Sequence, residues 1–285
     1  MKKRIAFHRF YWYYPISKKV RQREGTMRYL QRWIICAFMC IFIYVFLSGS
    51  AFAGKAMVVA VNANWPPMQI KDDKGNITGY EIDMIRAIAS EAGFQVKIVN
   101  VPWGRIFKDL DAGKCDAVMA SVSITQSRKE KFDFSDPYFT AEQLLVIPKA
   151  LVGTPLTGKE IAVFKLTTGA DAIRESQRCK MTYYTVEETE KAFKDLADGQ
   201  VAGVFCDSPV ALKYAFSKGK YYGKFAITSE TYVVDNQLPK EEYGIAVKKG
   251  NAKTLDLINK GLQAVKGKGI DNQIRDKWFR FLFSS

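Results

Sequence analysis

The sequence predicts an α/β protein built from two similar lobes, and three observations support this fold class. Short apolar runs typical of β-strands alternate with segments of helical periodicity over residues 58–120. The same alternation returns over residues 161–209. Extended segments at 143–148 and 243–247 flank this second series. Such alternation is typical of βαβ units, in which helices cover the faces of a parallel sheet.

In the first series, strands are expected at 58–61, 96–99 and 117–120. A helix begins near Tyr80, because Ile82, Ile85, Ile88 and Ala89 fall on one helical face, and Gly93 is a natural stop. A second helix is expected at 105–112, closed by Gly113, and the Trp-Pro-Pro sequence at 65–67 forces a turn.

In the second series, strands are expected at 161–164, 181–184 and 202–206. Thr168 is expected to cap a helix that runs to residue 177. Thr185 and Glu188 form a capping box that opens another helix, which ends by residue 199. A further helix starts at 208–209, where Ser is followed by Pro.

The simplest topology places lobe 1 at 54–145 and lobe 2 at 146–242, with the chain returning to lobe 1 over 243–285. The chain then crosses between lobes along 143–148 and 243–247, and helices at 252–265 and 271–282 pack back on lobe 1. Ligands of open α/β sheets bind at the carboxyl ends of the strands, so two facing lobes create one cleft.

Residues 1–53 have the pattern of a secretory signal peptide. They carry ten Lys and Arg against one acid and contain a fifteen-residue apolar run at 33–47, followed by Ala-Phe-Ala at 51–53. The run is shorter than the roughly 20 residues that span a bilayer. Cleavage is therefore expected after Ala53. Met27 offers an alternative start of translation, because the residues that follow it form an n-region of ordinary length.

The composition excludes several function classes. Most of the net charge of +14 lies in residues 1–53; the rest carries 33 bases and 28 acids without a basic patch, which argues against nucleic-acid binding. The single histidine is His8, so after cleavage neither His-dependent catalysis nor imidazole-bound zinc is available. Cys115, Cys179 and Cys206 match no metal site and allow one disulfide at most, and pairing of Cys179 with Cys206 stays open.

Polar and aromatic residues follow the predicted strands and are therefore expected to face the cleft. From these segments and the start of the 168–177 helix, the candidate ligand-binding residues are Asn62, Trp65, Trp103, Ser121, Ser123, Arg128, Thr168 and Asp207.

Together these side chains suit a zwitterion. Arg128 offers a planar fork of donors that matches a carboxylate, and the free N–H groups of the helix that Thr125 caps favour the same anion. Asp207, on the other lobe, supplies the negative charge that an ammonium needs. A ligand that bridges Arg128 and Asp207 would also favour closure of the lobes.

An ordered set of motifs resembles the family 3 periplasmic solute-binding proteins of polar-amino-acid ABC importers, which have the type II periplasmic binding protein fold. The set lies at 65–67, 79–83, 101–103, 116–125, 128, 132–138, 167–169, 207–209, 243–247 and 277–279. The resemblance implies an α/β fold of two lobes, each a sheet flanked by helices, joined by two hinge strands. It also implies a monomer of the periplasm that delivers an amino acid to a membrane permease, without catalysis, cofactor or metal.

The resemblance implies specific roles for the candidate residues. The arginine matching Arg128 takes the ligand's α-carboxylate, and the aspartate matching Asp207 takes its α-ammonium. Ser121, Ser123 and Thr168 complete that grip, while Asn62, Trp65 and Trp103 surround the ligand's side chain. Two positions depart from the family pattern. Asn62 stands where binders of basic amino acids usually carry an acid, and Leu166 replaces a usual glycine and is expected to add bulk beside the carboxylate site.

Two alternative functions stay open at this point. The first is an enzyme that resembles the cyclohexadienyl dehydratases, which would need a general acid in the cleft; the candidates are Glu81, Asp83 and Glu142. The second is a receptor that passes ligand occupancy to a membrane kinase, since signalling and transport need the same closure. The identity of the amino acid does not follow from the sequence.

Overall fold

The computed structural model describes residues 55–228 and 240–280. The described residues belong to one compact unit. The expected signal peptide, the alternative start at Met27 and the last residues of the expected 271–282 helix lie outside the described residues.

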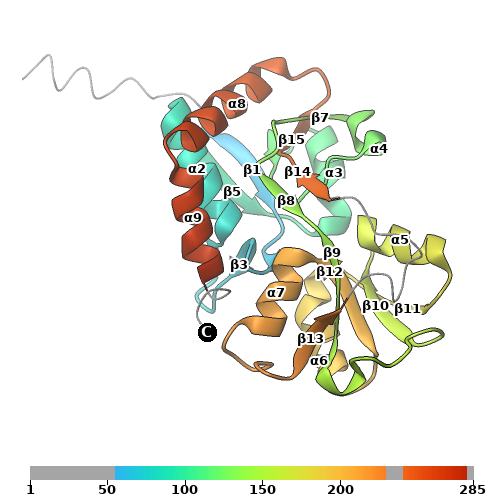
Figure 1. Ribbon diagram of the computed structural model, residues 1–285. Helices are drawn as coiled ribbons and strands as arrows, with labels where there is room; N and C mark the ends of the chain where they lie inside the picture. Colours follow the sequence, from blue (N-terminus) through green and yellow to red (C-terminus); the bar gives the residue numbers. More distant parts are fainter. Residues whose placement is uncertain (1–54, 229–239, 281–285) are drawn as a thin grey trace, which may run out of the picture. The chain divides into compact units, whose positions relative to one another are not determined.

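Two five-stranded sheets organise the described chain (Figure 1). The first has the order β5 (Val96–Asn100), β1 (Met57–Val61), β6 (Ala117–Val118), β15 (Ala246–Lys248), β7 (Phe132–Phe134). The second has the order β11 (Lys180–Tyr184), β10 (Glu160–Phe164), β12 (Gly203–Asp207), β9 (Gln143–Pro148), β13 (Phe225–Thr228). In each sheet, three parallel strands are followed by a strand that runs antiparallel to them.

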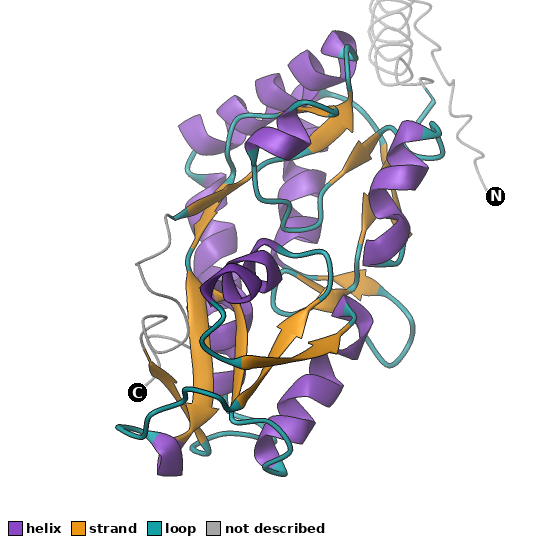
Figure 2. Ribbon diagram, turned by 90° about the vertical axis from the view of Figure 1, so that its right-hand side faces the viewer, coloured by secondary structure: helices purple, strands orange, loops and turns teal. Residues whose placement is uncertain are grey.

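Helices flank both sheets, as Figure 2 shows. We call lobe 1 the first sheet with α2 (Tyr80–Ala92), α3 (Trp103–Asp111), α4 (Gln126–Lys129), α8 (Ala252–Gly267) and α9 (Ile270–Phe279). Lobe 2 is the second sheet with α5 (Thr168–Ser176), α6 (Thr189–Ala197), α7 (Ser208–Phe216) and the 3₁₀ helices η1 (Lys149–Leu151) and η2 (Val186–Glu188). A small ribbon of β2 (Asn64–Trp65), β3 (Gln69–Lys71) and β4 (Ile77–Thr78) completes lobe 1.

Two short strands pair between the lobes. β8 (Phe139–Ala141) leads into lobe 2 and β14 (Glu241–Tyr243) leads back to lobe 1, and they run antiparallel with Glu241 opposite Ala141. Figure 1 shows both strands between the two sheets. This pair therefore provides the two connections that allow one lobe to move against the other.

Apolar periodicity explains how lobe 1 packs. The expected face of α2 is fully buried: Ile82, Ile85 and Ile88 have no exposed surface. Both α8 and α9 pack against α2, so the C-terminal helices lie on lobe 1. Gly261 permits this contact, because a Cβ there would lie 2.4 Å from the carbonyl oxygen of Ile88.

Some local expectations were wrong in detail. α3 begins at Trp103 rather than at residue 105, because Pro102 has extended backbone angles and serves as the N-cap. The N-cap of α5 is Thr167, whose hydroxyl accepts from Ala170 N at 3.3 Å, so Thr168 is the first helical residue. The capping box of Thr185 and Glu188 is confirmed, although it opens η2, from which α6 follows.

Candidate ligand-binding cleft

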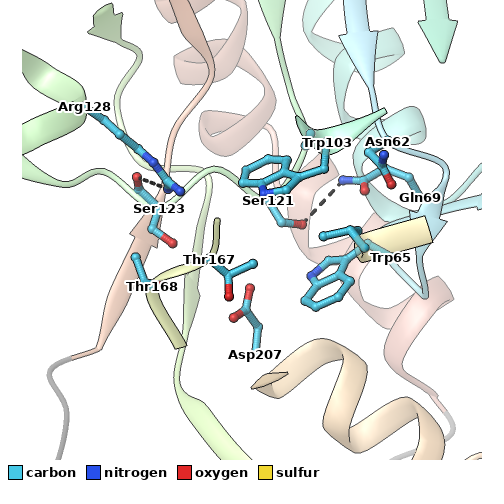
Figure 3. A pocket seen from close by; sticks show the side chains of 12 residues that line it. Asn62, Trp65, Gln69, Trp103, Ser121, Ser123, Arg128, Thr167, Thr168 and Asp207 are labelled. Carbon is cyan, nitrogen blue, oxygen red and sulfur yellow. Dashed lines mark hydrogen bonds between the residues drawn. The ribbon is translucent and has the colours of Figure 1, made fainter. Parts of the chain in front are cut away.

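One cavity between the lobes brings all the predicted ligand-binding residues together. Its lining consists of Asn62, Trp65, Gln69, Trp103, Ala120, Ser121, Ser123, Arg128, Thr167, Thr168, Val186 and Asp207. Arg128 reaches it from lobe 1 and Asp207 from lobe 2 (Figure 3). The cavity is narrow. The centre of a water-sized sphere can occupy only about 20 Å³ inside it. A larger opening of about 1300 Å³ adjoins it and shares Trp103 and Arg128.

Arg128 is held in place by its own short helix and by aromatic rings. The Thr125 hydroxyl accepts from Arg128 N at 3.3 Å, which fixes the single turn of α4. Arg128 Nη1 donates to the carbonyl oxygen of Ser123 at 2.9 Å, and the guanidinium lies 5.6 Å from the Trp103 ring and 5.4 Å from the Phe107 ring. The remaining guanidinium donors make it suitable for binding an anion. Because α4 is a single turn of four residues, the expected anion-binding role depends on the guanidinium rather than on the helix terminus.

Asp207 ends β12 and is almost fully buried. Gln143 Nε2 donates to its Oδ1 at 2.6 Å, and the Tyr243 hydroxyl donates to Oδ2. Burial raises the pKa of Asp207 to about 6, and the nearby negative charge of Glu241 adds to the rise. A buried carboxylate of this kind favours a cation as its partner.

The aromatic walls come from both lobes. The Trp65 ring meets the Phe164 ring of lobe 2 edge-to-face, with 5.0 Å between centroids. Trp103 Nε1 donates to the carbonyl oxygen of Leu166 at 3.2 Å, again across the cleft. These contacts give the cavity flat, rigid sides that suit an apolar or planar ligand side chain.

A third contact across the cleft involves Glu187 of η2. One of its carboxylate oxygens accepts from Asn62 Nδ2 at 2.6 Å and from the backbone N–H of Trp103 at 2.8 Å. Burial alone would raise the pKa of Glu187, but these hydrogen bonds and those from its own lobe hold the pKa below its usual range. An ionised acid of lobe 2 thus stands beside Asn62.

Leu166 does not add bulk to the inner cavity as expected. Its φ of 62° lies in the left-handed region, which favours the glycine that the family pattern has at this position. That conformation turns the side chain outward, where it is 68% exposed and lines the larger opening. Leu166 therefore alters the mouth of the cleft rather than the expected carboxylate site.

The three acids considered for catalysis do not line the cavity. Asp83 accepts from Lys277 and Trp278 on the outer side of α2, and Glu142 pairs with Lys240 at 2.8 Å. Glu81 lies behind Ser121, whose N–H and hydroxyl each donate to its Oε1 at 2.9 Å.

Glu81 is fully buried, and it accepts further hydrogen bonds from Tyr138 at 2.6 Å and from Gln69. Burial raises the pKa of Glu81 to about 7. Ser121 and Gln69 separate this carboxyl from the cavity, so it supports the wall of the site.

Several residues around the cavity were not among the predicted ligand-binding residues. Gln69 lines the cavity although no predicted strand precedes it, and Thr167 lines it although the sequence indicated it only as part of the motif at 167–169. Gln143 and Glu241 reach Asp207 and Ser123 from β9 and β14, the strands next to the lobe connections. Only the pairing of distant segments reveals them. Cys115, Cys179 and Cys206 are all free thiols, so the open question of a Cys179–Cys206 disulfide is answered in the negative.

Comparison with known proteins identifies the relatives of this chain. The family model for bacterial extracellular solute-binding proteins, family 3, matches residues 57–281. A protein of Neisseria gonorrhoeae named "Probable histidine-binding protein" is 29% identical over 266 residues, which cover 88% of this chain and 96% of that protein.

Two solved structures are informative neighbours. An ancestral arginine-binding protein bound to glutamine is 33% identical with a TM-score of 0.69, covering 79% of this chain and 97% of that one. The ancestral amino acid-binding protein AncCDT-1, a precursor of cyclohexadienyl dehydratase, is 31% identical with a TM-score of 0.68, covering 79% and 95%.

Proposed function

The chain belongs to the family 3 bacterial extracellular solute-binding proteins and has their two-lobed type II fold, and on that premise we propose that it captures an amino acid for an ABC importer. One observation carries the proposal. A single cavity is lined by Arg128 from lobe 1 and Asp207 from lobe 2, with hydroxyls and tryptophans between them. Opposite charges on opposite lobes match the two charged groups of an α-amino acid.

The proposed binding mode assigns each residue a contact. Arg128 takes the α-carboxylate, with the hydroxyls of Ser123 and Thr168 as further donors, and Asp207 takes the α-ammonium. Ser121 adds a polar contact from lobe 1, while Asn62, Trp65 and Trp103 surround the side chain. Because the ligand touches both lobes only when they meet, binding favours the closed form, which the permease then recognises.

We propose that the protein acts without catalysis. Asp207 is the only acid in the described lining of the cavity, and the mode above commits it to the ligand's ammonium. The similarity to AncCDT-1 keeps the dehydratase alternative in view. Of the three acids considered for catalysis, Glu81 is the one that contacts the wall of the cavity, and it already accepts four hydrogen bonds there. A general acid needs reach to the reacting atoms, which this carboxyl lacks.

The proposed setting is the periplasm, reached through cleavage of residues 1–53, where the protein acts as a monomer with a membrane permease as partner. Among the helices of residues 55–228 and 240–280, none is long and apolar enough to cross a bilayer. Coupling to a sensory kinase is the alternative partner and would use the same closure.

A thermal-shift screen tests the proposal. The protein is expressed with its own N-terminal segment, purified, unfolded and refolded to remove co-purified solutes, and then screened against amino acids and prephenate-like acids. A ligand at a thousandfold excess over its Kd should stabilise the fold by roughly 4 kcal/mol. A shift with one or a few amino acids that is lost in Arg128→Ala supports the receptor. A response to prephenate-like acids alone would overturn it in favour of the dehydratase.

A further inference from the structure

The carboxylate of Glu241 lies where the proposed ligand's carboxylate should bind. Glu241 begins β14, and its Oε2 accepts from the hydroxyl of Ser123 and from the hydroxyl of Thr168 at 2.9 Å. Its Oε1 accepts from Gln143 Nε2 at 3.2 Å. Ser123 belongs to lobe 1 and Thr168 to lobe 2, so this one side chain bridges the cleft.

A hydroxyl group has a single hydrogen to donate. Ser123 and Thr168 therefore cannot donate to Glu241 and to a bound α-carboxylate at the same time. The two carboxylates would also repel each other at such short range. The charge of Glu241 also acts on the Arg128 guanidinium more strongly than that of the other carboxylates named beside it, Asp207 and Asp171.

The dimensions of the cavity agree with this conflict. The centre of a water-sized sphere can occupy only about 20 Å³ of the cavity, so the side chains around it stand close together. An amino acid that binds between Arg128 and Asp207 therefore requires these side chains or the two lobes to move. Of the groups around the site, Glu241 is the one that already occupies the carboxylate's hydrogen-bond partners.

We propose that Glu241 is an internal competitor for the α-carboxylate subsite: it holds the two lobes together before ligand enters and must be displaced for an amino acid to bind. This inference rests on the proposed function, because it takes the subsite from there. It makes Glu241 a determinant of affinity that opposes binding, whereas an acid that pairs with a ligand cation would favour binding.

The test compares Glu241→Ala and Glu241→Gln with the matched control Glu242→Gln. Glu242 is the next residue of β14, so its side chain points to the other face of the strand, where it is exposed. Each protein is made with its own N-terminal segment, refolded as above, and titrated with L-histidine, L-arginine and L-glutamine by calorimetry. Two variants guard against the chance that one of them fails to fold.

Removing a competing anion with two hydrogen bonds should lower Kd by about 10- to 100-fold for the amino acids that bind the unaltered protein. Glu242→Gln should leave Kd within twofold. If the unaltered protein binds none of the three but Glu241→Ala does, the inference is also supported.

An unchanged Kd in both Glu241 variants would overturn the inference and leave the proposed function standing. A Kd that rises tenfold would overturn it too and would identify Glu241 as a partner of a ligand cation. If no variant binds any amino acid, and the screen finds none either, the proposed function itself falls.

Discussion

Glu187 should control how firmly the cleft closes, and Glu187→Ala tests this directly. The carboxylate of this lobe 2 residue accepts from Asn62 Nδ2 at 2.6 Å and from Trp103 N at 2.8 Å, both in lobe 1. A hydrogen bond to a charged acceptor contributes about 1.5–3 kcal/mol. Because Glu187 is exposed to solvent, we take a smaller value of about 1–1.5 kcal/mol for each bond, which makes about 2–3 kcal/mol for the pair.

If closure is coupled to binding, this loss raises Kd by roughly 30- to 150-fold, mainly through faster dissociation. Calorimetry with the amino acid found in the screen gives Kd, and stopped-flow displacement gives the dissociation rate. Glu190→Ala is the matched control, because Glu190 contacts Tyr214, Lys220 and Tyr221 within lobe 2 only. A Kd within threefold of the unaltered protein in Glu187→Ala would refute the reasoning.

Three further predictions follow from the charges and backbone of the site. Asp207 has a pKa of about 6 in the free protein, so affinity for an amino acid should weaken about tenfold between pH 7.5 and pH 5; calorimetry that finds no such loss would argue against Asp207 as the ammonium partner. Glu81 has its pKa raised from 4.5 to about 7, so the folded state keeps a proton that the unfolded chain releases as the pH rises through this window. The free energy of unfolding, relative to Glu81→Gln, should therefore fall by about 3 kcal/mol from pH 4.5 to pH 8 in denaturant titrations; a constant difference would refute this. Leu166→Gly should raise the free energy of unfolding by about 0.5–1 kcal/mol because φ is 62° there, whereas Leu166→Ala, which keeps the strain, should not; a loss of stability in Leu166→Gly would show that the side chain packs across the cleft.

Most of the fold could be predicted because its longer elements carry local signals. The face of Ile82, Ile85 and Ile88 is strictly helical, and all three are buried. Strands of three residues such as β7 and β8 have no periodicity of their own and were not predicted. They exist because neighbouring strands supply their hydrogen bonds, and no local pattern reports that.

The same distinction between local signals and long-range pairing applies to the residues of the candidate site. Trp65, Trp103 and Asp207 could be located because they lie within or directly beside strands, whose ends meet at one edge. Gln69 could not, because it lies in the short hairpin of β2 and β3, which carries no strand pattern. Glu241 could not, because it reaches Ser123 and Thr168 only through the pairing of β14 with the distant β8. The sequence indicated Glu187 only as part of a predicted helix start. Its contact with Trp103 of lobe 1 could not be predicted, because nothing in its own lobe indicates such a partner.

Carboxylates account for much of how this cleft is held together without ligand. Glu187 of lobe 2 accepts hydrogen bonds from lobe 1, and Glu241 accepts one hydrogen bond from each lobe. The protein's own side chains therefore stabilise the closed arrangement of the lobes. The two acids have opposite consequences for binding. Glu187 accepts from Asn62 and Trp103, outside the proposed carboxylate subsite, so its contribution should persist in the closed complex. Glu241 accepts from the hydroxyls that the proposed binding mode gives to the ligand's carboxylate, so its contribution should be lost on binding. Removal of the Glu187 carboxylate should raise Kd, and removal of the Glu241 carboxylate should lower it, although both changes remove a hydrogen bond between the same two lobes.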